Sequence, residues 1–315
     1  MSVYTELSNT DFQNVLADYN LGSLSGFEGI AAGIENSNFF INTEGSENSG
    51  RFVLTIFERL AADELPYFMT LMKHLAAGGL ACPDVMVRRD DTLLFNVKGK
   101  QGCIVSCLSG KTHEQLNAQQ LFSSGRAMAK LHMAGEDFPQ RRANPTGIDW
   151  LQENIKAVLD GTYATYGEAA AKLLLSELDF QQSCAWDTLP RGVVHGDLFC
   201  DNILFQDNDV SGIIDFYYAH DAPYVMDIAI SLNAQAVLLS KQDASRMQSF
   251  LDGYQSLRRL EEDEREAIPL LLRLAALRFW VSRLYDALFP RGGAMTQIKN
   301  PEEYRKKLLF HRHTD

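Results

Sequence analysis

Three polar side chains stand out in a largely apolar stretch of sequence between residues 195 and 216. The chain reads HGDLFCDN over 195–202, and IIDF follows at 213–216. Phosphoryl transfer from ATP needs a group that orients the attacking hydroxyl and accepts its proton, and ligands for the magnesium ions that bridge the phosphates. Asp197, Asn202 and Asp215 have the types and the order that this chemistry requires.

The spacing of these residues suggests a role for each. Asp197 and Asn202 are five positions apart, so one loop can present a carboxylate to the acceptor and an amide oxygen to a metal. Asp215 ends an apolar run, where a strand can hold it for Mg²⁺, a cation that prefers oxygen ligands. Any one of them alone is more often a turn or capping residue. Together they predict Asp197 as the catalytic carboxylate, Asn202 and Asp215 as metal ligands, and ATP and Mg²⁺ as cofactors.

His195 is the second catalytic candidate, because its side chain titrates near neutral pH. In this arrangement we expect it to support the loop through hydrogen bonds rather than to act as the base.

The N-terminal part of the sequence predicts an antiparallel sheet with one main helix. Apolar residues at helical spacing open the chain around Phe12–Tyr19, and Leu65–Ala77 has the same period. Strand patterns occupy NFFINT, RFVLTIFE, TLLFNV and CIVSC, and the last two are joined by a predicted turn at residues 99–102.

Helical periodicity dominates after Gly110. The predicted helices are 121–133, 151–159, 169–178, 225–239 and 268–288, and GVVHGD, NILF and VSGIIDF are predicted as short strands and turns. We therefore expect an α+β chain with two parts, residues 1–106 and 107–315, joined by a hinge near 106–110.

Composition limits the possible partners. The 315 residues are 46% hydrophobic and carry a net charge of −12, with a pI near 5.1 and no dense basic cluster, which argues against nucleic acid or a membrane surface. The five cysteines include no CxxC pair, the first residues lack a secretory leader, and charges interrupt the apolar stretch 268–289. We expect a cytoplasmic protein, monomeric or homodimeric.

At HGDLFCDN and IIDF the chain resembles the aminoglycoside phosphotransferase and choline kinase branch of the protein-kinase-like fold. Further segments, including GIENSNFFI, ELPYFMTLMKHLAAGGLACP, MDIAISLNA and LRLAALRFWVSRLYDAL, look like the homoserine kinases built on that fold, over residues 33–288. The resemblance implies an N-terminal nucleotide-binding lobe, a larger helical catalytic lobe, and phosphorylation of the homoserine hydroxyl in threonine biosynthesis.

The resemblance also implies nucleotide contacts. The loop between the family's first strands corresponds to Gly33, Glu35, Asn36, Ser37 and Asn38, and the segment that pairs with adenine corresponds to Cys103–Gly110, including Ser106 and Leu108. Read without the resemblance, these segments are a hairpin turn and an edge strand.

One position departs from the family pattern. The strand RFVLTIFE has Thr55 where kinases usually place the lysine that holds the α- and β-phosphates. Arg51 and Arg59 alternate onto the same strand face, and the helix 65–77 has no glutamate to pair with such a lysine. The sequence leaves the replacing cation open.

A zwitterionic acceptor needs a cation for its carboxylate, for which arginine is best suited, and polar groups for its ammonium. The candidates are Tyr217, Asp221, Asn233, Arg278 and Arg283, each of which has an ordinary structural reading. Two alternatives stay open: an aminoglycoside, choline or another amino alcohol as acceptor, and a kinase-like binding module without activity.

Overall fold

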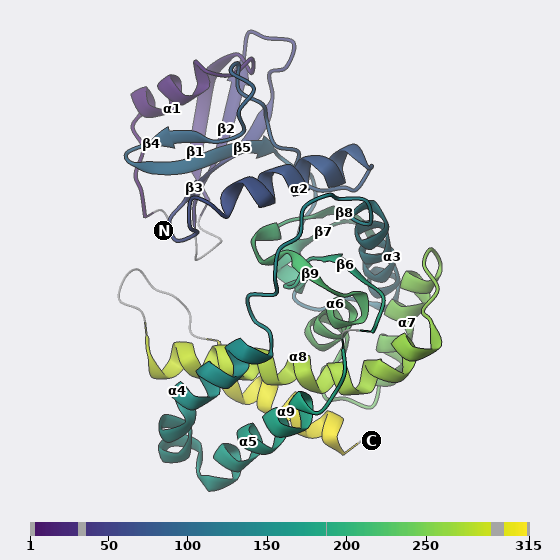
Figure 1. Ribbon diagram of the computed structural model, residues 1–315. Helices are drawn as coiled ribbons and strands as arrows, with labels where there is room; N and C mark the ends of the chain where they lie inside the picture. Colours follow the sequence, from purple (N-terminus) through teal and green to yellow (C-terminus); the bar gives the residue numbers. More distant parts are fainter. Residues whose placement is uncertain (1–3, 31–35, 187, 291–298, 314–315) are drawn as a thin grey trace. The chain divides into compact units, whose positions relative to one another are not determined.

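The computed structural model describes residues 4–30, 36–186, 188–290 and 299–313 (Figure 1). This part of the chain divides into two compact units that meet in sequence between Ser109 and Gly110. Within the described residues, the helices are too short or too polar to traverse a lipid bilayer.

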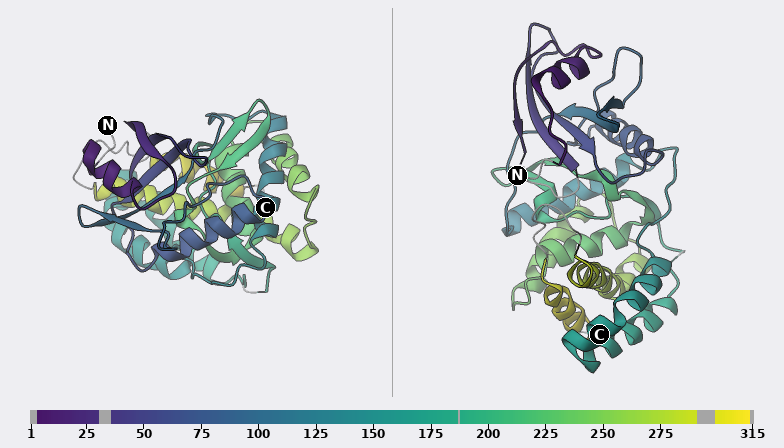
Figure 2. Two further views of the ribbon diagram at one scale, coloured as in Figure 1. Left: turned by 90° about the horizontal axis from the view of Figure 1, so that it is seen from above. Right: turned by 90° about the vertical axis from the view of Figure 1, so that its left-hand side faces the viewer.

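The N-terminal unit contains an antiparallel sheet (Figures 1 and 2). Its hydrogen-bonded neighbours follow the order β1-β2-β3-β5-β4. The strands are β1 (Ser23–Gly29), β2 (Asn36–Glu44), β3 (Arg51–Phe57), β4 (Phe95–Val97) and β5 (Lys100–Ser106). The register places Asn38 opposite Thr55, and Thr55 opposite Cys103. Side chains alternate between the two faces along each strand, so every second residue faces the core.

Two helices accompany the sheet, α1 (Asn9–Leu16) and α2 (Leu65–Ala77). Ser8 caps α1 in a capping box with Asp11. The apolar side of α1 packs on one face of the sheet, in a core that includes Phe12, Leu16, Phe39, Ile41, Leu54, Ile56 and Ile104. Period-two residues of the central strands therefore give this sheet one apolar face covered by α1.

The turn between β4 and β5 differs from the prediction. It lies at Lys98–Gly99, where both residues have positive φ (+49° and +76°), and Lys100 already belongs to β5. A two-residue turn of this kind matches the twist of the strands that it joins, and this explains why the predicted turn at 99–102 was wrong.

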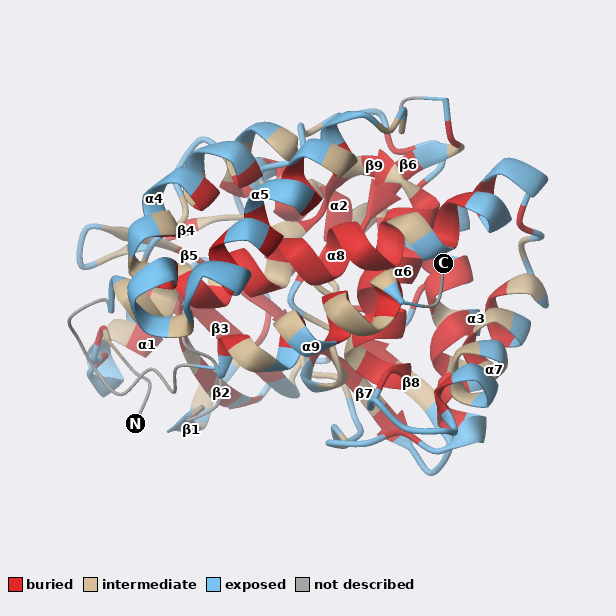
Figure 3. Cartoon of the chain, turned by 90° about the horizontal axis from the view of Figure 1, so that it is seen from below, coloured by how far each residue is buried: buried red, intermediate tan, exposed pale blue. Residues whose placement is uncertain are grey.

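The C-terminal unit is mainly helical. Its helices are α3 (Ala118–Ala134), α4 (Ile148–Tyr166), α5 (Glu168–Gln182), α6 (Tyr224–Ser231), α7 (Asp243–Gln255), α8 (Glu262–Leu288) and α9 (Pro301–Arg312). Most of α8 is buried (Figure 3), and its fully buried residues include Leu277, Trp280 and Leu284. A helix that is apolar on most sides is usually buried in the core. Helices α4, α6 and α9 all pack on α8.

Two small antiparallel strand pairs lie among these helices. They are β6 (Arg191–Val194) with β9 (His220–Pro223), and β7 (Ile203–Gln206) with β8 (Asp209–Ile213). Short 3₁₀ turns η1 (Cys200–Asn202) and η2 (Phe216–Tyr218) precede β7 and follow β8. The residues singled out by the sequence therefore lie at strand ends and in tight turns.

The helix predicted over 225–239 is wrong in its second half. The α-helix α6 ends at Ser231, and a π-helical turn, η3 (Leu232–Ala236), follows. Side chains from other helices bind the carbonyl groups that a continuing α-helix would use: Lys307 donates to the carbonyl of Asn233, and Arg246 donates to those of Gln235 and Ala236.

Candidate active site

The loop after β6 carries the predicted catalytic residue. Gly196 has φ = +76°, and a Cβ atom at this position would lie 2.8 Å from the carbonyl oxygen of Tyr218. Only glycine fits both the left-handed backbone and this close approach. The glycine turns the chain between the end of β6 and Asp197.

The carboxylate of Asp227, in α6, accepts hydrogen bonds from the backbone of this loop. One carboxylate oxygen accepts the amide of His195 at 2.8 Å, and the other accepts the amide of Gly196 at 2.9 Å. His132, in α3, contacts the same carboxylate through Nε2 at 3.0 Å. Burial by itself would raise the pKa of Asp227, but the hydrogen bonds and charge of His132, together with the His195 contacts, hold it below its usual value.

Sequence reasoning did not identify Asp227 or His132 as site residues. The available signal was an acid inside the apolar helix YVMDIAIS and a histidine on the apolar face of α3. A fully buried carboxylate needs partners, so each of these residues on its own indicates a buried polar contact.

The imidazole of His195 joins the loop to the segment that ends in Asp215. Its Nε2 donates to the carbonyl of Ile214 at 2.9 Å, and its Nδ1 accepts the amide of Asp197 at 3.3 Å. The two bonds require the neutral tautomer with the proton on Nε2, and burial lowers the pKa of His195 accordingly. Both ring nitrogens are engaged by backbone groups, an arrangement that fits a residue supporting the loop.

Asn202 folds back onto the same loop. Its Nδ2 donates to the carbonyl of Asp197 at 2.8 Å and lies 3.5 Å from the Asp197 carboxylate. The amide of Ile214 donates to the carbonyl of Asn202 at 3.0 Å. The structure thus brings Asp197, Asn202 and the residue before Asp215 into one hydrogen-bonded group.

Asp215 follows β8 in the left-handed region (φ = +66°) and is exposed. Its carboxylate lies close enough to Asp197 to raise that residue's pKa. A non-glycine residue held at positive φ is uncommon and indicates a backbone constrained by its surroundings. An exposed carboxylate is a suitable ligand for a hard cation.

The electrostatic environment of Asp197 is unusual. Burial raises its pKa to about 8, the Arg278 guanidinium opposes the rise, and the Asp215 carboxylate adds to it. A carboxyl group with a pKa near neutrality is matched to proton transfer at physiological pH. Arg278 also donates to the carbonyl of Gly196 at 2.6 Å, so it contacts the loop as well as influencing its charge.

The predicted acceptor residues do not form one group. Asn233 is fully buried, with its amide donating to Leu272 and its side-chain oxygen contacting His311. Arg283 pairs with Glu303 at 2.7 Å and donates to the carbonyl of Asn300. Asp221 pairs with two arginines, whereas Tyr217 lies half-buried just after Asp215. Two of the predicted residues lie beside the candidate catalytic residues: Tyr217 follows Asp215 by two positions, and Arg278 contacts the carbonyl of Gly196.

The predicted nucleotide loop is described only from Asn36 onward; Gly33 and Glu35 lie outside the described residues. Asn38 and Thr55 share a face of the sheet, where the Thr55 hydroxyl donates to the Asn38 oxygen at 2.8 Å. The Asn36 oxygen lies 3.5 Å from the amide of Glu58. These two asparagines are on strand β2, next to the loop.

Ser37 points to the opposite face, the one covered by α1. Its hydroxyl accepts the amides of Tyr4 and Thr5 and donates to Glu58 at 2.6 Å. Lys100 pairs with the same Glu58 and donates to the Thr5 hydroxyl. The Ser37 side chain and the Lys100 ammonium therefore anchor the N-terminal segment, and neither shares a face with Thr55.

The predicted adenine segment begins at the end of β5. Ser106 is fixed by Asp84, whose amide donates to the Ser106 hydroxyl at 2.9 Å and whose carbonyl accepts the Ser106 amide. Leu108 lies beyond the strand, and its carbonyl has only a long contact with the Cys107 thiol among the described residues.

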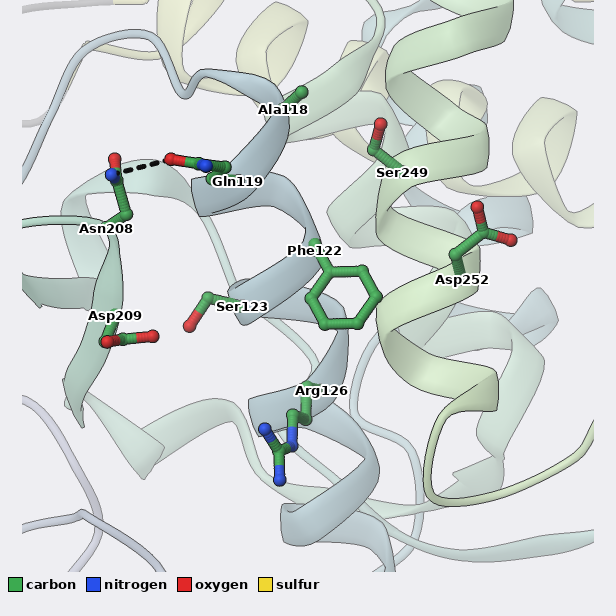
Figure 4. A pocket seen from close by; sticks show the side chains of 9 residues that line it. All are labelled: Ala118, Gln119, Phe122, Ser123, Arg126, Asn208, Asp209, Ser249 and Asp252. Carbon is green, nitrogen blue, oxygen red and sulfur yellow. Dashed lines mark hydrogen bonds between the residues drawn. The ribbon is translucent and has the colours of Figure 1, made fainter.

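A shallow hollow of about 570 Å³ lies elsewhere in the C-terminal unit, between α3, α7 and the turn from β7 to β8 (Figure 4). Phe122 projects into it, and Asn208 donates to Gln119 at its edge at 2.8 Å. Its lining lacks Asp197, Asn202 and Asp215, so it is not part of the candidate active site.

Comparisons with known proteins give consistent results. A family model described as the phosphotransferase enzyme family matches residues 26–266. A homoserine kinase of Neisseria meningitidis serogroup B is 40% identical over 310 residues, which cover 98% of this chain and 99% of that protein. A homoserine kinase of Rhizobium meliloti is also 40% identical, covering 99% of this chain and 95% of that protein.

Solved structures show the fold. An amicoumacin kinase in complex with AMP-PNP, Ca²⁺ and Ami matches with a TM-score of 0.71 and 14% identity, covering 98% of this chain and 92% of that one. A spectinomycin phosphotransferase in complex with ADP and spectinomycin matches with a TM-score of 0.69 and 12% identity, covering 97% and 95%. The predicted fold class, α+β and protein-kinase-like, is confirmed.

Proposed function

We propose that this chain, which belongs to the phosphotransferase enzyme family, transfers the γ-phosphoryl group of ATP to the side-chain hydroxyl of L-homoserine and forms O-phosphohomoserine. Membership of the family implies the use of ATP. The choice of homoserine rests on relatives of that activity that are 40% identical over almost the whole chain. The observation that carries the chemistry is the hydrogen-bonded group formed by Asp197, Asn202 and the backbone beside Asp215.

In this proposal Asp197 accepts a hydrogen bond from the homoserine hydroxyl and takes its proton as the oxygen attacks the γ-phosphorus. The amide of Asn202 keeps the Asp197 backbone in place through its 2.8 Å bond. His195 and Asp227 fix the same loop, so the carboxylate needs little reorganisation during the reaction. The loop supplies orientation, and Asp197 supplies the proton acceptor.

We propose that the Asn202 oxygen and the Asp215 carboxylate hold Mg²⁺ together with the phosphates. Mg²⁺ is commonly bound by one or two protein oxygens plus substrate phosphates, and it neutralises charge on the phosphoryl group that is transferred. The described residues contain no cluster of three or more His, Cys, Asp or Glu side chains arranged for a metal. A site completed by ATP therefore fits this chain better than a self-sufficient metal site.

For the nucleotide we propose contacts from the backbone of residues 33–38, from Asn36 and Asn38, and from the backbone at Ser106 and Leu108. The Ser37 side chain is left out, because its hydroxyl is bonded to Tyr4, Thr5 and Glu58. We propose that Tyr217 contacts the acceptor. The positive charge of Arg278 acts on the neighbouring Asp197 carboxylate. Asn233 and Arg283 are left out because protein groups occupy them.

A comparison of acceptors tests this proposal. ATP-dependent formation of a phosphate ester is measured by ³¹P NMR and by coupled ADP release for L-homoserine, choline and an aminoglycoside. We expect kcat/KM to be at least a hundredfold higher for homoserine. A higher value for choline or the aminoglycoside would assign the other acceptor class, and ATP binding without any product would assign a binding module.

A further inference from the structure

A small pocket lies in the C-terminal unit beside the catalytic loop. Its volume is about 180 Å³, and its lining comes from the segment before α4, from Trp186, and from β9, α6 and α8. Asp197, Asn202 and Asp215 do not line it. From Arg278 the wall continues down α8 to Leu271, seven residues away, which is about 10 Å along a helix. The pocket therefore extends away from the reacting groups.

Arg278 gives this pocket a buried positive charge with one hydrogen-bond acceptor among the described residues. The residue is only 4% exposed, and one of its N–H groups donates to the carbonyl of Gly196. Within the described ranges, no carboxylate lies within ion-pair distance of its guanidinium. The Asp197 and Asp227 carboxylates act on Arg278 only from beyond ion-pair distance, so an anion entering the pocket would form the direct ion pair that Arg278 lacks among the described residues.

Both arginines and acids surround Arg278. Among the lining residues Arg191 and Arg278 oppose one acid, Asp221, for a net charge of +1. Arg141 pairs with Asp221 at 3.0 Å, and Arg142 donates to the carbonyl of Ala219 beside it. Asp197 and Asp227 also act on Arg278, so these four arginines face three acids, a net charge of +1. The whole chain carries −12, so a local excess of arginines is a specific feature of this region.

The other lining residues indicate which further chemical groups a ligand of this pocket would carry. The indole Nε1 of Trp186 is buried and has no acceptor among the residues that the structure describes. Met226, Leu271 and Leu274 form an apolar surface, and the volume is below the roughly 300–1,000 Å³ of sites for drug-sized molecules. One or two carboxylate oxygens facing Arg278 and Trp186, with a short aliphatic chain on the leucines, would match these groups.

We propose that this pocket binds a small aliphatic carboxylate and that binding slows the reaction by drawing Arg278 away from the catalytic loop. The same guanidinium that lines the pocket holds the Gly196 carbonyl, one residue before Asp197. A carboxylate in the pocket competes with that carbonyl for the N–H groups of Arg278. The effect on turnover rests on the proposed function, whereas binding itself does not.

Three probes test whether binding depends on a carboxylate group: butyrate, L-2-aminobutyrate and n-butylamine. We expect ligand-observed NMR titrations of the full-length protein to show binding of both acids and at least tenfold weaker binding of the amine. Equal binding of the amine, or no binding of either acid, would overturn the proposal. The two acids also distinguish amino acids from simple carboxylic acids as the natural source.

A pocket-filling variant provides the second arm. Thr146 is a half-buried lining residue in the segment before α4, so Thr146→Trp should weaken butyrate binding at least tenfold. The matched control is Thr165→Trp, at an exposed position on α4, which should bind butyrate as the wild type does and keep its turnover. Leu274→Phe fills the same pocket from α8, and it tests the pocket if the tryptophan variant does not fold.

Kinetics distinguish a second site from the acceptor site. Butyrate should lower kcat for homoserine severalfold with little change in KM, and Thr146→Trp should remove this response. Displacement of butyrate by saturating homoserine would identify the pocket with the acceptor site and overturn the proposal. If no homoserine were phosphorylated even without butyrate, the proposed function would fail, while the binding titrations would still decide whether the pocket takes a carboxylate.

Discussion

The Asp227 carboxylate is fully buried, and three donors surround it: the amides of His195 and Gly196, and the imidazole of His132. Hydrogen bonds to a charged group are among the stronger ones in proteins, and a buried charge that loses its partners is costly. This residue therefore links the stability of the C-terminal unit to the geometry of the catalytic loop.

Replacing Asp227 by Asn should reduce both stability and activity. The amide keeps the size of the side chain but puts a donor where one carboxylate oxygen now accepts, so we expect a loss of about 3–5 kcal/mol of unfolding free energy. The loss is measured by urea denaturation, and kcat is measured at a temperature where the variant is folded.

The control is Asp179→Asn, at an exposed position on α5. Exposed substitutions of this kind usually change stability by less than about 0.5 kcal/mol. If Asp227→Asn were as stable and active as Asp179→Asn, the carboxylate would not be holding the loop.

His220 provides a pH test. Burial lowers its pKa to about 4, with the Tyr218 carbonyl opposing the shift and the charges of Arg278 and Arg142 adding to it. Asp227 acts in the opposite direction. Between pH 6.5 and 4 the unfolded chain binds a proton that the folded chain does not, so this residue lowers stability as the pH falls. From pH 7 to pH 5 the loss should be about 2 kcal/mol.

The measurement is the difference in unfolding free energy between the wild type and His220→Asn at pH 7 and at pH 5. The asparagine can donate to the Tyr218 carbonyl as the imidazole does, but it does not titrate. The two proteins should differ in their dependence on pH. Parallel curves would mean that His220 takes up its proton equally in the folded and unfolded chain, so that folding does not lower its pKa.

At the scale of elements, two glycines with φ = +76° allow backbone strain to be separated from close contact. Gly196 is in the catalytic loop, where an added Cβ would meet the Tyr218 carbonyl at 2.8 Å. Gly99 is in the β4–β5 turn, and an added Cβ there would have no neighbour within 4 Å. The pair is therefore matched in backbone and different in surroundings.

We expect Gly99→Ala to cost about 1–2 kcal/mol of unfolding free energy, the usual cost of a left-handed residue, and to leave kcat nearly unchanged. Gly196→Ala should cost more and should lower kcat at least tenfold, because the loop must move away from Tyr218. Thermal unfolding and steady-state kinetics give the two quantities. Equal effects of the two substitutions would show that the loop tolerates a side chain at this position.

Elements with a clear apolar period could be predicted from the sequence. Leu65–Ala77 has the predicted bounds, and the long helix α8 was found from its apolar run 268–288. By contrast α7 and α9 were missed, because both are rich in polar residues and bury few side chains, such as Phe250 and Tyr304. Strand β9, with the sequence HDAP, lacks any strand pattern and forms by pairing with β6.

At the scale of the whole molecule, the site residues that the sequence predicted are those with a local pattern. Asp197, Asn202 and Asp215 lie within twenty residues of one another, and their spacing carried the prediction. Asp227 and His132 are 95 positions apart and meet only in the folded chain. The sequence also placed Ser37 in the nucleotide loop, but its face is decided by the register of β2, which puts it with the N-terminal segment.

Removal of metal provides a prediction for the intact protein. A ligand that binds only the folded state stabilises it by about 2.7 kcal/mol at a concentration of one hundred times Kd. ATP with Mg²⁺ should therefore raise Tm, and EDTA should remove most of the increase. Asp215→Asn should lose the magnesium-dependent part, while Asp179→Asn should keep it. An increase that is the same with EDTA would contradict the assignment of Asp215 as a metal ligand.

The most direct test of the account is the rate of phosphoryl transfer to homoserine catalysed by Asp197→Asn, measured in a single turnover with γ-labelled ATP. General base catalysis contributes roughly 10²–10⁴-fold, so the variant should be slower by that factor while its Tm and its affinity for ATP stay close to those of the wild type. A variant that transfers phosphate to homoserine as fast as the wild type would show that Asp197 is not the proton acceptor, and would contradict the mechanism.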